Sequence, residues 1–472
     1  MAPFFRHPIF NKPRLKQRYP KPAFKPSRPQ HRRLDQSMMI SNQTHVSTAL
    51  ATHLLSDEQD SNVVFSPLSI QVALSVLSAG CKGETLDQLL AFLKADTMDD
   101  LNSLYLELVS SILADGSPGG GPILSSVNAV WVGENVSLKP CFKQVVDTVY
   151  RAACKKVDFQ KFSYVLFDIN LGYFVYKLRV LMFWISQNGS LLKLQNLVFD
   201  MWLIYIYIFL STKAVEVAEE VNSWAKKETN GLIKEVITAE EVSDVTMLIL
   251  ANAIYFKGTW RQQFETSLTE EGDFHLLNGN KVKVPFMTSS KNQFVHEYDD
   301  FKVLGLPYSQ GPDKRKFTMY FYLSDAKDGL PSLIKKIGYT PNFFDHHIPR
   351  EKVRVGEFFI PKFKIEFGFE ASDMLKKLGL KLPFEFGPRI TEIVDSPNLY
   401  VSSVIHKSVV EVNEEGTEAA AVTVVTTDVG CPLRKIMIKD WVDFVADHPF
   451  LFVIREDVTG VVLFMGQVIH PS

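Results

Sequence analysis

The chain has 472 residues, of which 46% are hydrophobic and 22% are charged, with 51 basic residues against 53 acidic ones. This globular composition excludes wholesale disorder, collagen and small disulfide scaffolds, and a net charge of −2 gives no general reason to expect nucleic acid as a partner. The four cysteines are too few for a disulfide framework and too far apart for a Cys-x-x-Cys metal site, which favours a reducing, cytoplasmic location over the extracellular space, the alternative.

Residues 1–37 form the first distinct segment. They include ten Lys or Arg, one acid and seven prolines, and no apolar run follows them that could serve as a secretory signal. Such a composition cannot bury a core, so we expect a basic, disordered extension before a single domain that spans residues 38–472. The favoured interpretation is a non-native leader with the functional start at Met38 or Met39, and a transit peptide is the alternative.

Helical periodicity dominates the part that follows. The spacing of apolar residues predicts helices over Gln43–Leu55, Ser69–Leu77, Leu86–Leu93, Leu101–Leu113, Lys139–Ala153 and Val215–Glu228. Pro67 is suited to the entry of the second of these helices, and Asn230-Gly231 is a stop signal after the last.

Residues 161–211 interrupt this series. Of these 51 residues, 34 are hydrophobic and 13 are aromatic, and none is proline. A pair of transmembrane spans is disfavoured, because Asp168, Lys177, Arg179 and Asp200 fall inside the apolar runs, where a charge is costly. We interpret the segment as a retained intron that interrupts the domain, with a lineage-specific insertion as the alternative.

Strands dominate the second half. Thr246–Phe256 is almost continuously apolar and predicts a central strand buried on both faces. Asn278-Gly279 predicts a hairpin between Phe274–Leu277 and Lys281–Phe286. Further strands are predicted over Val303–Leu306, Phe317–Leu323, Val353–Ile360, Phe363–Phe367, Val409–Val412, Phe450–Ile454 and Val461–Val468. Helices first and strands later predict an α+β domain with mostly antiparallel sheets.

The sequence offers little support for catalysis. It contains no Gly-x-Ser-x-Gly elbow, P-loop, His-Glu-x-x-His or Gly-x-Gly-x-x-Gly motif, and we expect no cofactor, no metal and no enzymatic activity. Ser66, Ser69, Asn252 and His406 could be assembled into a hydrolase site, but a buried polar hydrogen-bond cluster is the favoured interpretation.

The segment that begins at Glu414 has a divided local preference. Helix formers come first and strand formers follow, as expected of a segment with two alternative structures. Drawn as a strand, it has one uncharged face, which carries Thr417, Ala419, Ala421, Thr423, Val425, Thr427 and Val429, whereas Glu418 and Asp428 share the other. A strand with such a face can enter a sheet between two existing strands. An exposed edge strand or a linker is the alternative.

Four motifs in order carry a family resemblance: Asn62-x-x-Phe65-Ser66-Pro67-x-Ser69, Asn252-Ala253-x-Tyr255-Phe256-Lys257-Gly258-x-Trp260, Glu411 to Ala421, and Asp447-His448-Pro449-Phe450. Together they resemble the motifs of the serpins, and their sequences are most similar to those of plant serpins of the Z type. The resemblance covers Met39–Gln160 and Thr212–Pro471. It implies the serpin fold, with about nine helices, mostly antiparallel sheets and an exposed reactive-centre loop.

The resemblance also implies a function. The chain would be a monomeric, irreversible suicide inhibitor of serine endopeptidases, and in addition of cysteine proteases, whose cleaved loop inserts into the central sheet; neither nucleic acid nor a membrane is expected as a partner. The implied hinge is Glu414, Glu415, Gly416, Thr417, Glu418, Ala419, Ala420 and Ala421. Ser66, Ser69, Asn252 and His406 would form a polar cluster beneath the opening sheet, and Trp260 would lie near the point of entry.

The cleaved bond stays open between two positions. The family's spacing from Glu414 indicates Gly430–Cys431, whereas side-chain chemistry favours Arg434–Lys435, since Leu433-Arg434 suits a trypsin-like serine protease or an arginine-specific cysteine protease. A non-inhibitory serpin-fold protein, for storage or binding, is the alternative function, and residues 161–211 would abolish inhibition if they obstructed insertion.

Overall fold

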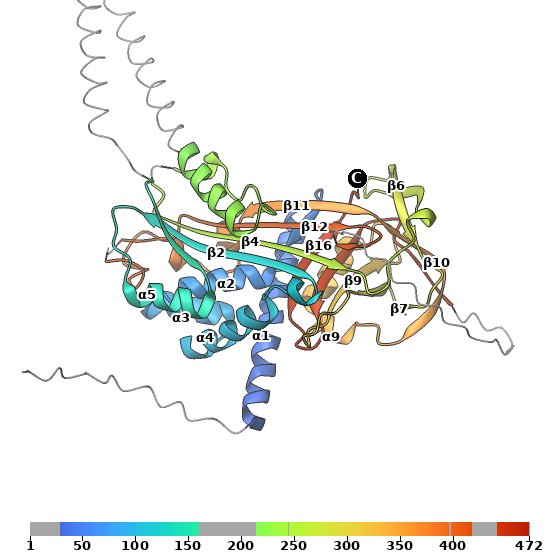
Figure 1. The fold of residues 1–472 in the computed structure, drawn as a ribbon, viewed down its shortest axis with the longest axis horizontal. Coiled ribbons are helices and arrows are strands. Elements are labelled where there is room, and N and C mark those ends of the chain that lie inside the picture. The colour runs from blue at the N-terminus through green and yellow to red at the C-terminus, as the bar shows by residue number, and fades with distance from the viewer. Residues whose placement is uncertain (1–28, 160–213, 244, 396–397, 418–440, 472) are drawn as a thin grey trace, which may run out of the picture.

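The computed structural model describes residues 29–159, 214–243, 245–395, 398–417 and 441–471 (Figure 1). Most of the basic segment 1–37 and all of 161–211 lie outside these residues. So do eight residues singled out from the sequence: Glu418, Ala419, Ala420, Ala421, Gly430, Cys431, Arg434 and Lys435. Among the described residues, no helix is long and apolar enough to cross a bilayer.

The described residues include nine α-helices, in agreement with the number that the resemblance implied. They are α1 (Pro29–Asp57), α2 (Pro67–Ser78), α3 (Gly83–Leu93), α4 (Met98–Glu107), α5 (Pro140–Val145), a helix over 214–228, α8 (Leu330–Tyr339), α9 (Phe343–His346) and α10 (Ser372–Lys377). The start of α2 follows from its sequence, because the Ser66 side chain accepts a hydrogen bond from the Ser69 N–H and Pro67 occupies the first turn.

The predicted helix over Lys139–Ala153 is wrong at its end. Helix α5 continues as a π-helical turn to Tyr150, and Arg151 then adopts a left-handed conformation with φ of 47°. That residue ends the helix, and β3 (Ala153–Val157) begins two residues later. The predicted helix over Leu101–Leu113 likewise ends as an α-helix at Glu107 and continues as a π-helical turn to Ile112.

Two sheets complete the fold. The first has six strands in the order β11 (Phe363–Glu370), β12 (Ser403–Val412), β13 (Gly416–Thr417), β4 (Leu248–Thr259), β2 (Ile123–Gly133) and β3. The second has ten strands: β1 (Val63–Phe65), β16 (Val462–Val468), β15 (Phe450–Glu456), β9 (Phe317–Ser324), β8 (Phe301–Pro307), β7 (Gln293–Glu297), β10 (Lys352–Pro361), β6 (Lys281–Thr288) and β5 (Glu270–His275) in this order, with β14 (Trp441–Val445) beside β10. Most neighbouring strands are antiparallel, as predicted.

Strand β4 is central, and both of its faces are buried, as the sequence predicted. Leu250, Ile254 and Phe256 belong to the main core, whereas Ala251 and Tyr255 pack in a second apolar cluster with the helix 214–228. That helix lies over one face of the six-stranded sheet, and α2 lies on the other (Figure 1). The Asn278-Gly279 hairpin is confirmed, with Gly279 at φ 82° between β5 and β6.

Candidate functional site

Strands β4 and β12 lie side by side and run parallel, and they carry the residues on which the sequence analysis depended. Their pairing extends from Ser403 opposite Ile249 to Val409 opposite Tyr255. Asn252 lies directly opposite His406 in the middle of this pairing. Ser66 and Ser69, at the start of α2, complete the predicted cluster from the core side of the sheet.

The side chains of this cluster form a continuous hydrogen-bond network. The Asn252 Oδ1 accepts hydrogen bonds from the Ser69 hydroxyl and from the His406 Nδ1–H, which lies 2.7 Å away, and its amide nitrogen donates to Asn128 Oδ1 on β2. The hydroxyl of Ser408 lies 2.8 Å from His406 Nε2. We call these six residues the polar cluster: Ser66, Ser69, Asn128, Asn252, His406 and Ser408.

The network holds His406 in its neutral form. Its Nε2 accepts the backbone N–H of Ser66 at 3.0 Å, so a proton on that nitrogen would face a donor. Burial lowers the pKa of His406 from 6.5 to about 3. The imidazole is fully buried, as are Ser66 and Ser69, so a substrate in solvent cannot reach them. The arrangement therefore favours a structural hydrogen-bond cluster over a hydrolase site.

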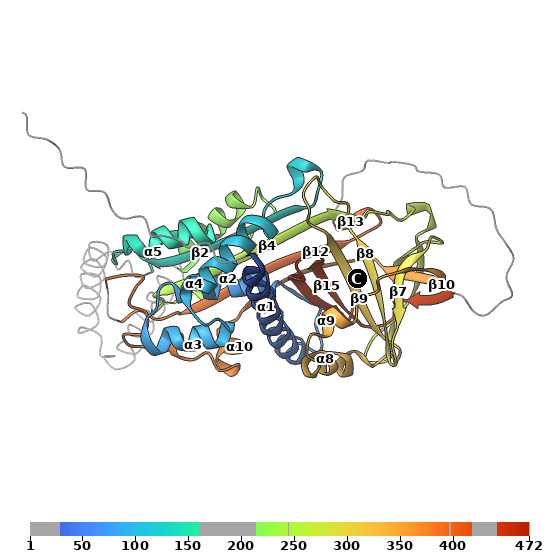
Figure 2. The same ribbon diagram turned by 90° about the horizontal axis from the view of Figure 1, so that it is seen from below.

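Beyond Tyr255 and Val409 the two strands separate, and β13 lies between them (Figure 2). Gly416 pairs with Thr259 and Thr417 with Gly258 on one side, and Thr417 pairs with Val412 on the other. Strand β13 is antiparallel to both neighbours. A Cβ on Gly416 would overlap the backbone carbonyl oxygen of Gly258, so only glycine fits here.

Buried contacts anchor the strand end. The Thr417 hydroxyl lies 2.7 Å from the hydroxyl of Tyr308, and the Tyr308 ring stacks on Trp260 with the ring centroids 4.5 Å apart. The indole Nε1–H of Trp260 donates to the carbonyl oxygen of Asn413 at 2.9 Å, and its backbone N–H donates to that of Glu415 at 2.8 Å. We call residues Asn413–Thr417 the anchor segment.

An ion pair closes the anchor segment at the surface. Lys362 Nζ lies 2.8 Å from a carboxylate oxygen of Glu414, and the hydroxyl of Thr269 donates to the other oxygen at 2.8 Å. Burial alone would raise the pKa of Glu414, but the hydrogen bond from Lys362 and those from the Glu414 backbone and Thr269 bring that pKa below its ordinary value. The carboxylate is thus charged at neutral pH and held in place.

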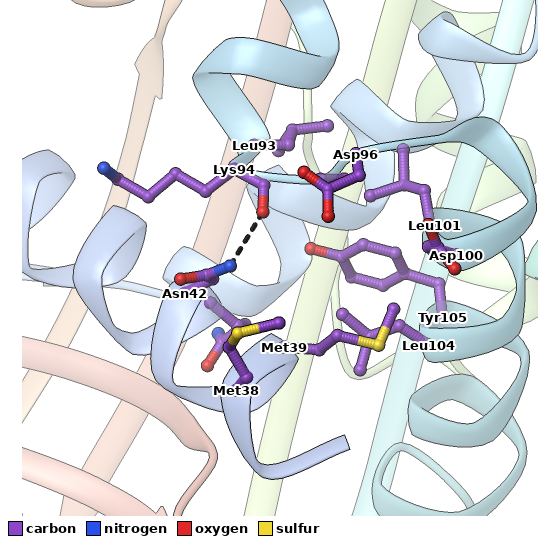
Figure 3. Close-up of a pocket in the computed structure, with 12 residues that line it drawn as sticks. Met38, Met39, Asn42, Leu93, Lys94, Asp96, Asp100, Leu101, Leu104 and Tyr105 are labelled. Atoms are coloured by element: carbon purple, nitrogen blue, oxygen red, sulfur yellow. Dashed lines mark hydrogen bonds between the residues drawn. The ribbon is translucent and has the colours of Figure 1, made fainter. Parts of the chain in front are cut away.

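A separate pocket of about 240 Å³ lies between α1, the end of α3 and α4 (Figure 3). Its lining is an even mixture of polar and apolar surface and includes Asp96 and Asp100, and the Asn42 amide donates to the Lys94 carbonyl oxygen at 2.9 Å. The lining contains no Ser, Cys or His. Among the described residues, no group of three or more His, Cys, Asp or Glu could hold a metal ion.

Comparison with known proteins decides the family. The family model "Serpin (serine protease inhibitor)" matches residues 41–171 and 208–471. The chain belongs to the serpin family. It is 49% identical to Serpin-ZX of Arabidopsis thaliana over 93% of this chain and 100% of that one, and 45% identical to Serpin-ZXA of Oryza sativa subsp. japonica over 93% and 98%.

Solved serpin structures agree with the fold. The native stressed conformation of Arabidopsis AtSerpin1 covers 92% of this serpin and 98% of its own chain, with 48% identity and a TM-score of 0.75. The cleaved Serpin 42Da covers 93% and 99%, with 25% identity and a TM-score of 0.69.

The structure brings Ser66, Ser69, Asn252 and His406 together, and places Trp260 against the backbone of Asn413 and Glu415. It also adds residues that the sequence analysis missed: Asn128, Ser408, Tyr308 and Lys362. Asn128 was missed because β2 itself was not predicted; its Ser-Ser-x-Asn stretch interrupts the apolar pattern. For Ser408 the available signal was the alternation with His406, two residues earlier on the same face.

Proposed function

We propose that this serpin inhibits serine-type endopeptidases as an irreversible suicide substrate. The protease serine would attack the carbonyl carbon of the loop bond, the C–N bond would break, and a proton would pass to the released amine while the ester remains on the protease. The cleaved loop would then insert between β4 and β12. One observation carries the proposal: β13 is a two-residue strand already paired with both of these strands.

The register of β13 supports continued insertion. If the pairing of Thr417 with Gly258 and Val412 extended along the chain, Ala421 would lie between Ile254 and Ser408, and Thr423 between Asn252 and His406. Opposed residues in a sheet share a face, so the uncharged face of the loop would point to the main core. Glu418 and Asp428 would point to the other side.

The polar cluster supplies a reason for insertion to wait for cleavage. Seven residue pairs hold β4 to β12, and the pair formed by Asn252 and His406 is joined by a side-chain hydrogen bond as well as through the backbone. Opening the pairing would separate buried polar groups, which creates a barrier rather than an equilibrium preference. In the inserted state the Thr423 hydroxyl would offer these groups a new partner. Strand addition to a sheet would then provide the stabilisation.

The target is proposed from the loop sequence. Arg434 suits trypsin-like serine proteases or arginine-specific cysteine proteases, and Gly430 fits the family's spacing. Cleavage at Arg434 would leave four more residues, about 13 Å of chain at ~3.3 Å per residue, between the sheet and the protease. Mass spectrometry of the fragment released from a trypsin complex would locate the bond.

The experiment that tests the proposal is incubation of the full chain with trypsin, followed by denaturing electrophoresis. We expect a covalent, SDS-stable complex, and we expect the Thr417→Arg variant to be cleaved without forming one, because the buried contact with Tyr308 has no room for a charged side chain. Chain cleaved at the loop should also melt at a much higher temperature. Cleaved and intact chains that melt alike would instead favour a non-inhibitory serpin, for storage or binding.

A further inference from the structure

The pocket between α1, the end of α3 and α4 contains a buried oxygen atom that lacks a hydrogen-bond donor. Gln43 lines the pocket and is 2% exposed, and its Oε1 has no partner among the residues that the structure describes. A buried acceptor without a donor costs free energy and is rare in folded proteins. The pocket shares no residue with the polar cluster or the anchor segment, so this oxygen belongs to neither.

The hydrogen bonds around Gln43 fix which atom of its amide is left over. The Ser47 hydroxyl donates to the backbone carbonyl oxygen of Gln43 at 2.9 Å, so its one proton is used. Ser47 must therefore accept from the Gln43 side chain 3.0 Å away, as it also accepts from the Gln71 amide at 2.9 Å. An amide turned by 180° would place Oε1 against an oxygen with no proton to give, so Oε1 is the atom left free toward the pocket.

The other polar side chains around the pocket are mostly acceptors too. The Tyr105 side chain points into the space shown in Figure 3, and its hydroxyl donates to Gln71 Oε1 at 3.2 Å, which leaves only its lone pairs. Asp96 and Asp100 are exposed at the mouth of the pocket. They bring two negative charges against the single positive charge of Lys94, the one basic residue of the described lining.

The pocket also offers apolar walls. These come from all three helices: Leu101, Leu104 and Tyr105 of α4, Leu93 of α3, and Met38 and Met39 of α1 (Figure 3). The volume of about 240 Å³ lies below the roughly 300–1,000 Å³ of pockets that take drug-sized ligands. The space therefore suits a compact molecule with an apolar body.

We propose that this pocket binds a small primary amine with an aromatic or alkyl body. The ammonium group of such a ligand has three N–H donors and no acceptor, which complements a lining that presents mainly acceptors. One N–H would donate to Gln43 Oε1 and a second to the Tyr105 hydroxyl oxygen, while the carboxylates of Asp96 and Asp100 would favour the positive charge. The body would pack on the leucines and methionines, where burial of apolar surface adds affinity.

Other classes of ligand fit this lining less well. A carboxylate or a phosphate would bring acceptors to acceptors, and it would face two carboxylates at the mouth. A metal ion would need several ligating side chains, and in the described part of the chain no group of three or more His, Cys, Asp or Glu gathers here or elsewhere. A neutral alcohol could satisfy Gln43 with its one O–H but would gain nothing from the carboxylates. The excess of acceptors thus selects an amine.

The test is calorimetric titration of the full chain with 2-phenylethylamine at neutral pH. We expect saturable binding at one site with a dissociation constant of about 1 mM or tighter. The comparison ligands are 2-phenylethanol and phenylacetate, which share the ring but end in a neutral and an anionic group. The alcohol should bind about tenfold more weakly, because hydrogen bonds from charged donors are the stronger ones, and phenylacetate should not bind. Absence of saturable amine binding, or binding of either analogue as tight as that of the amine, overturns the proposal.

Variants locate the amine in the pocket. Gln43→Met keeps the length of the side chain and removes the acceptor, so it should weaken amine binding about tenfold. Asp100→Asn should weaken it about threefold, since an exposed carboxylate is screened by solvent. The matched control is Asp99→Asn, which removes the neighbouring exposed carboxylate of α4 that does not line the pocket. Amine binding to this control should stay within about 1.5-fold of the parent.

A further variant guards against misfolding of Gln43→Met. Ala95 lines the pocket and is half-buried, so Ala95→Leu fills the space while leaving every polar group of the lining in place. It should abolish amine binding, and its melting temperature should match that of the parent. Amine binding that survives Ala95→Leu at the strength of the parent would place the ligand elsewhere on the protein and would overturn the proposal, as would unchanged binding to a folded Gln43→Met variant.

Discussion

The polar cluster and the anchor segment fasten the same two strands in different ways. In the polar cluster, buried neutral side chains from four parts of the chain join β4 to β12 at their middle. The anchor segment separates the two strands at their end. It is held there by Gly416, where no side chain fits, by the Thr417 hydroxyl, and by the ion pair of Glu414 near the surface. The difference indicates that the pairing is closed firmly at its middle and left open at the end from which a strand can enter.

The largest effect is expected from Asn252→Ala. The substitution leaves the His406 Nδ1–H and the Asn128 amide without their partner in a buried site, and should lower the stability of the native state by about 3 kcal/mol. The melting temperature of the intact chain should then fall by about 3 °C, measured by calorimetry. Ser126→Ala is the control, because the Ser126 hydroxyl on β2 has no hydrogen-bond partner among the described residues. Equal melting temperatures for Asn252→Ala and Ser126→Ala would contradict the inference that the polar cluster holds β4 to β12 at their middle.

The Gly416→Val substitution tests the anchor segment, where β13 lies between β4 and β12. The added side chain overlaps the Gly258 carbonyl oxygen and should expel β13 at a local cost of about 2 kcal/mol. Trp260 would lose its contacts with Asn413 and Glu415, so its fluorescence should shift to longer wavelength while the melting temperature changes little. A large fall in melting temperature without a fluorescence change would show that the two regions are not separable.

As the pH falls, the polar cluster should lose stability at a higher pH than the anchor segment does. The native pKa of His406 is about 3 and its ordinary value is 6.5, so between pH 7.5 and pH 5 the unfolded chain takes up a proton that the native chain does not. Stability is therefore lost as the pH falls, by about 2 kcal/mol from this group over that range. Urea unfolding of the parent and of His406→Gln at both pH values measures it. The variant should lose less stability on acidification, and parallel pH profiles would refute the assignment.

Lys362→Met should give the smallest effect. Glu414 is 7% exposed but Lys362 is 35% exposed, so solvent screening limits the pair to about 1 kcal/mol. Because the pKa of Glu414 is lowered, this contribution is present at neutral pH and is lost as the pH falls below about 4.5. Amide hydrogen exchange in residues 413–417 should become about fivefold faster at pH 7. Lys364→Met, which removes a similar pair with Glu411, is the control and should leave this exchange unchanged.

The sequence predicted the apolar elements well and the polar ones poorly, for one physical reason. Strand β4 is apolar almost throughout and was recognised, whereas β12 was predicted only from Val409 although it begins at Ser403. His406, Lys407 and Ser408 interrupt the apolar pattern of β12, and two of these three residues form the polar cluster. A strand that carries a buried polar network is therefore missed by hydrophobic periodicity, because that method assumes that polar residues face solvent.

The sequence motifs identified some, but not all, of the residues that hydrophobic periodicity missed. They brought Ser66, Ser69, Asn252 and His406 into one predicted group, and the structure confirms that these four residues meet. They did not identify Tyr308 or Lys362, because the roles of these residues depend on how the ends of β8 and β10 pack near β13. Such contacts join residues about 50 to 110 positions apart in the chain and leave no local pattern.

Strands β4 and β12 share one direction, and β13 between them has the opposite one. A strand that entered this gap with its chain running from the Thr259 end toward Leu248 would be antiparallel to both neighbours, as β13 already is. A free decapeptide that copies residues 418–427 and binds in this orientation would occupy the gap between β4 and β12, and would thereby prevent insertion of the molecule's own loop.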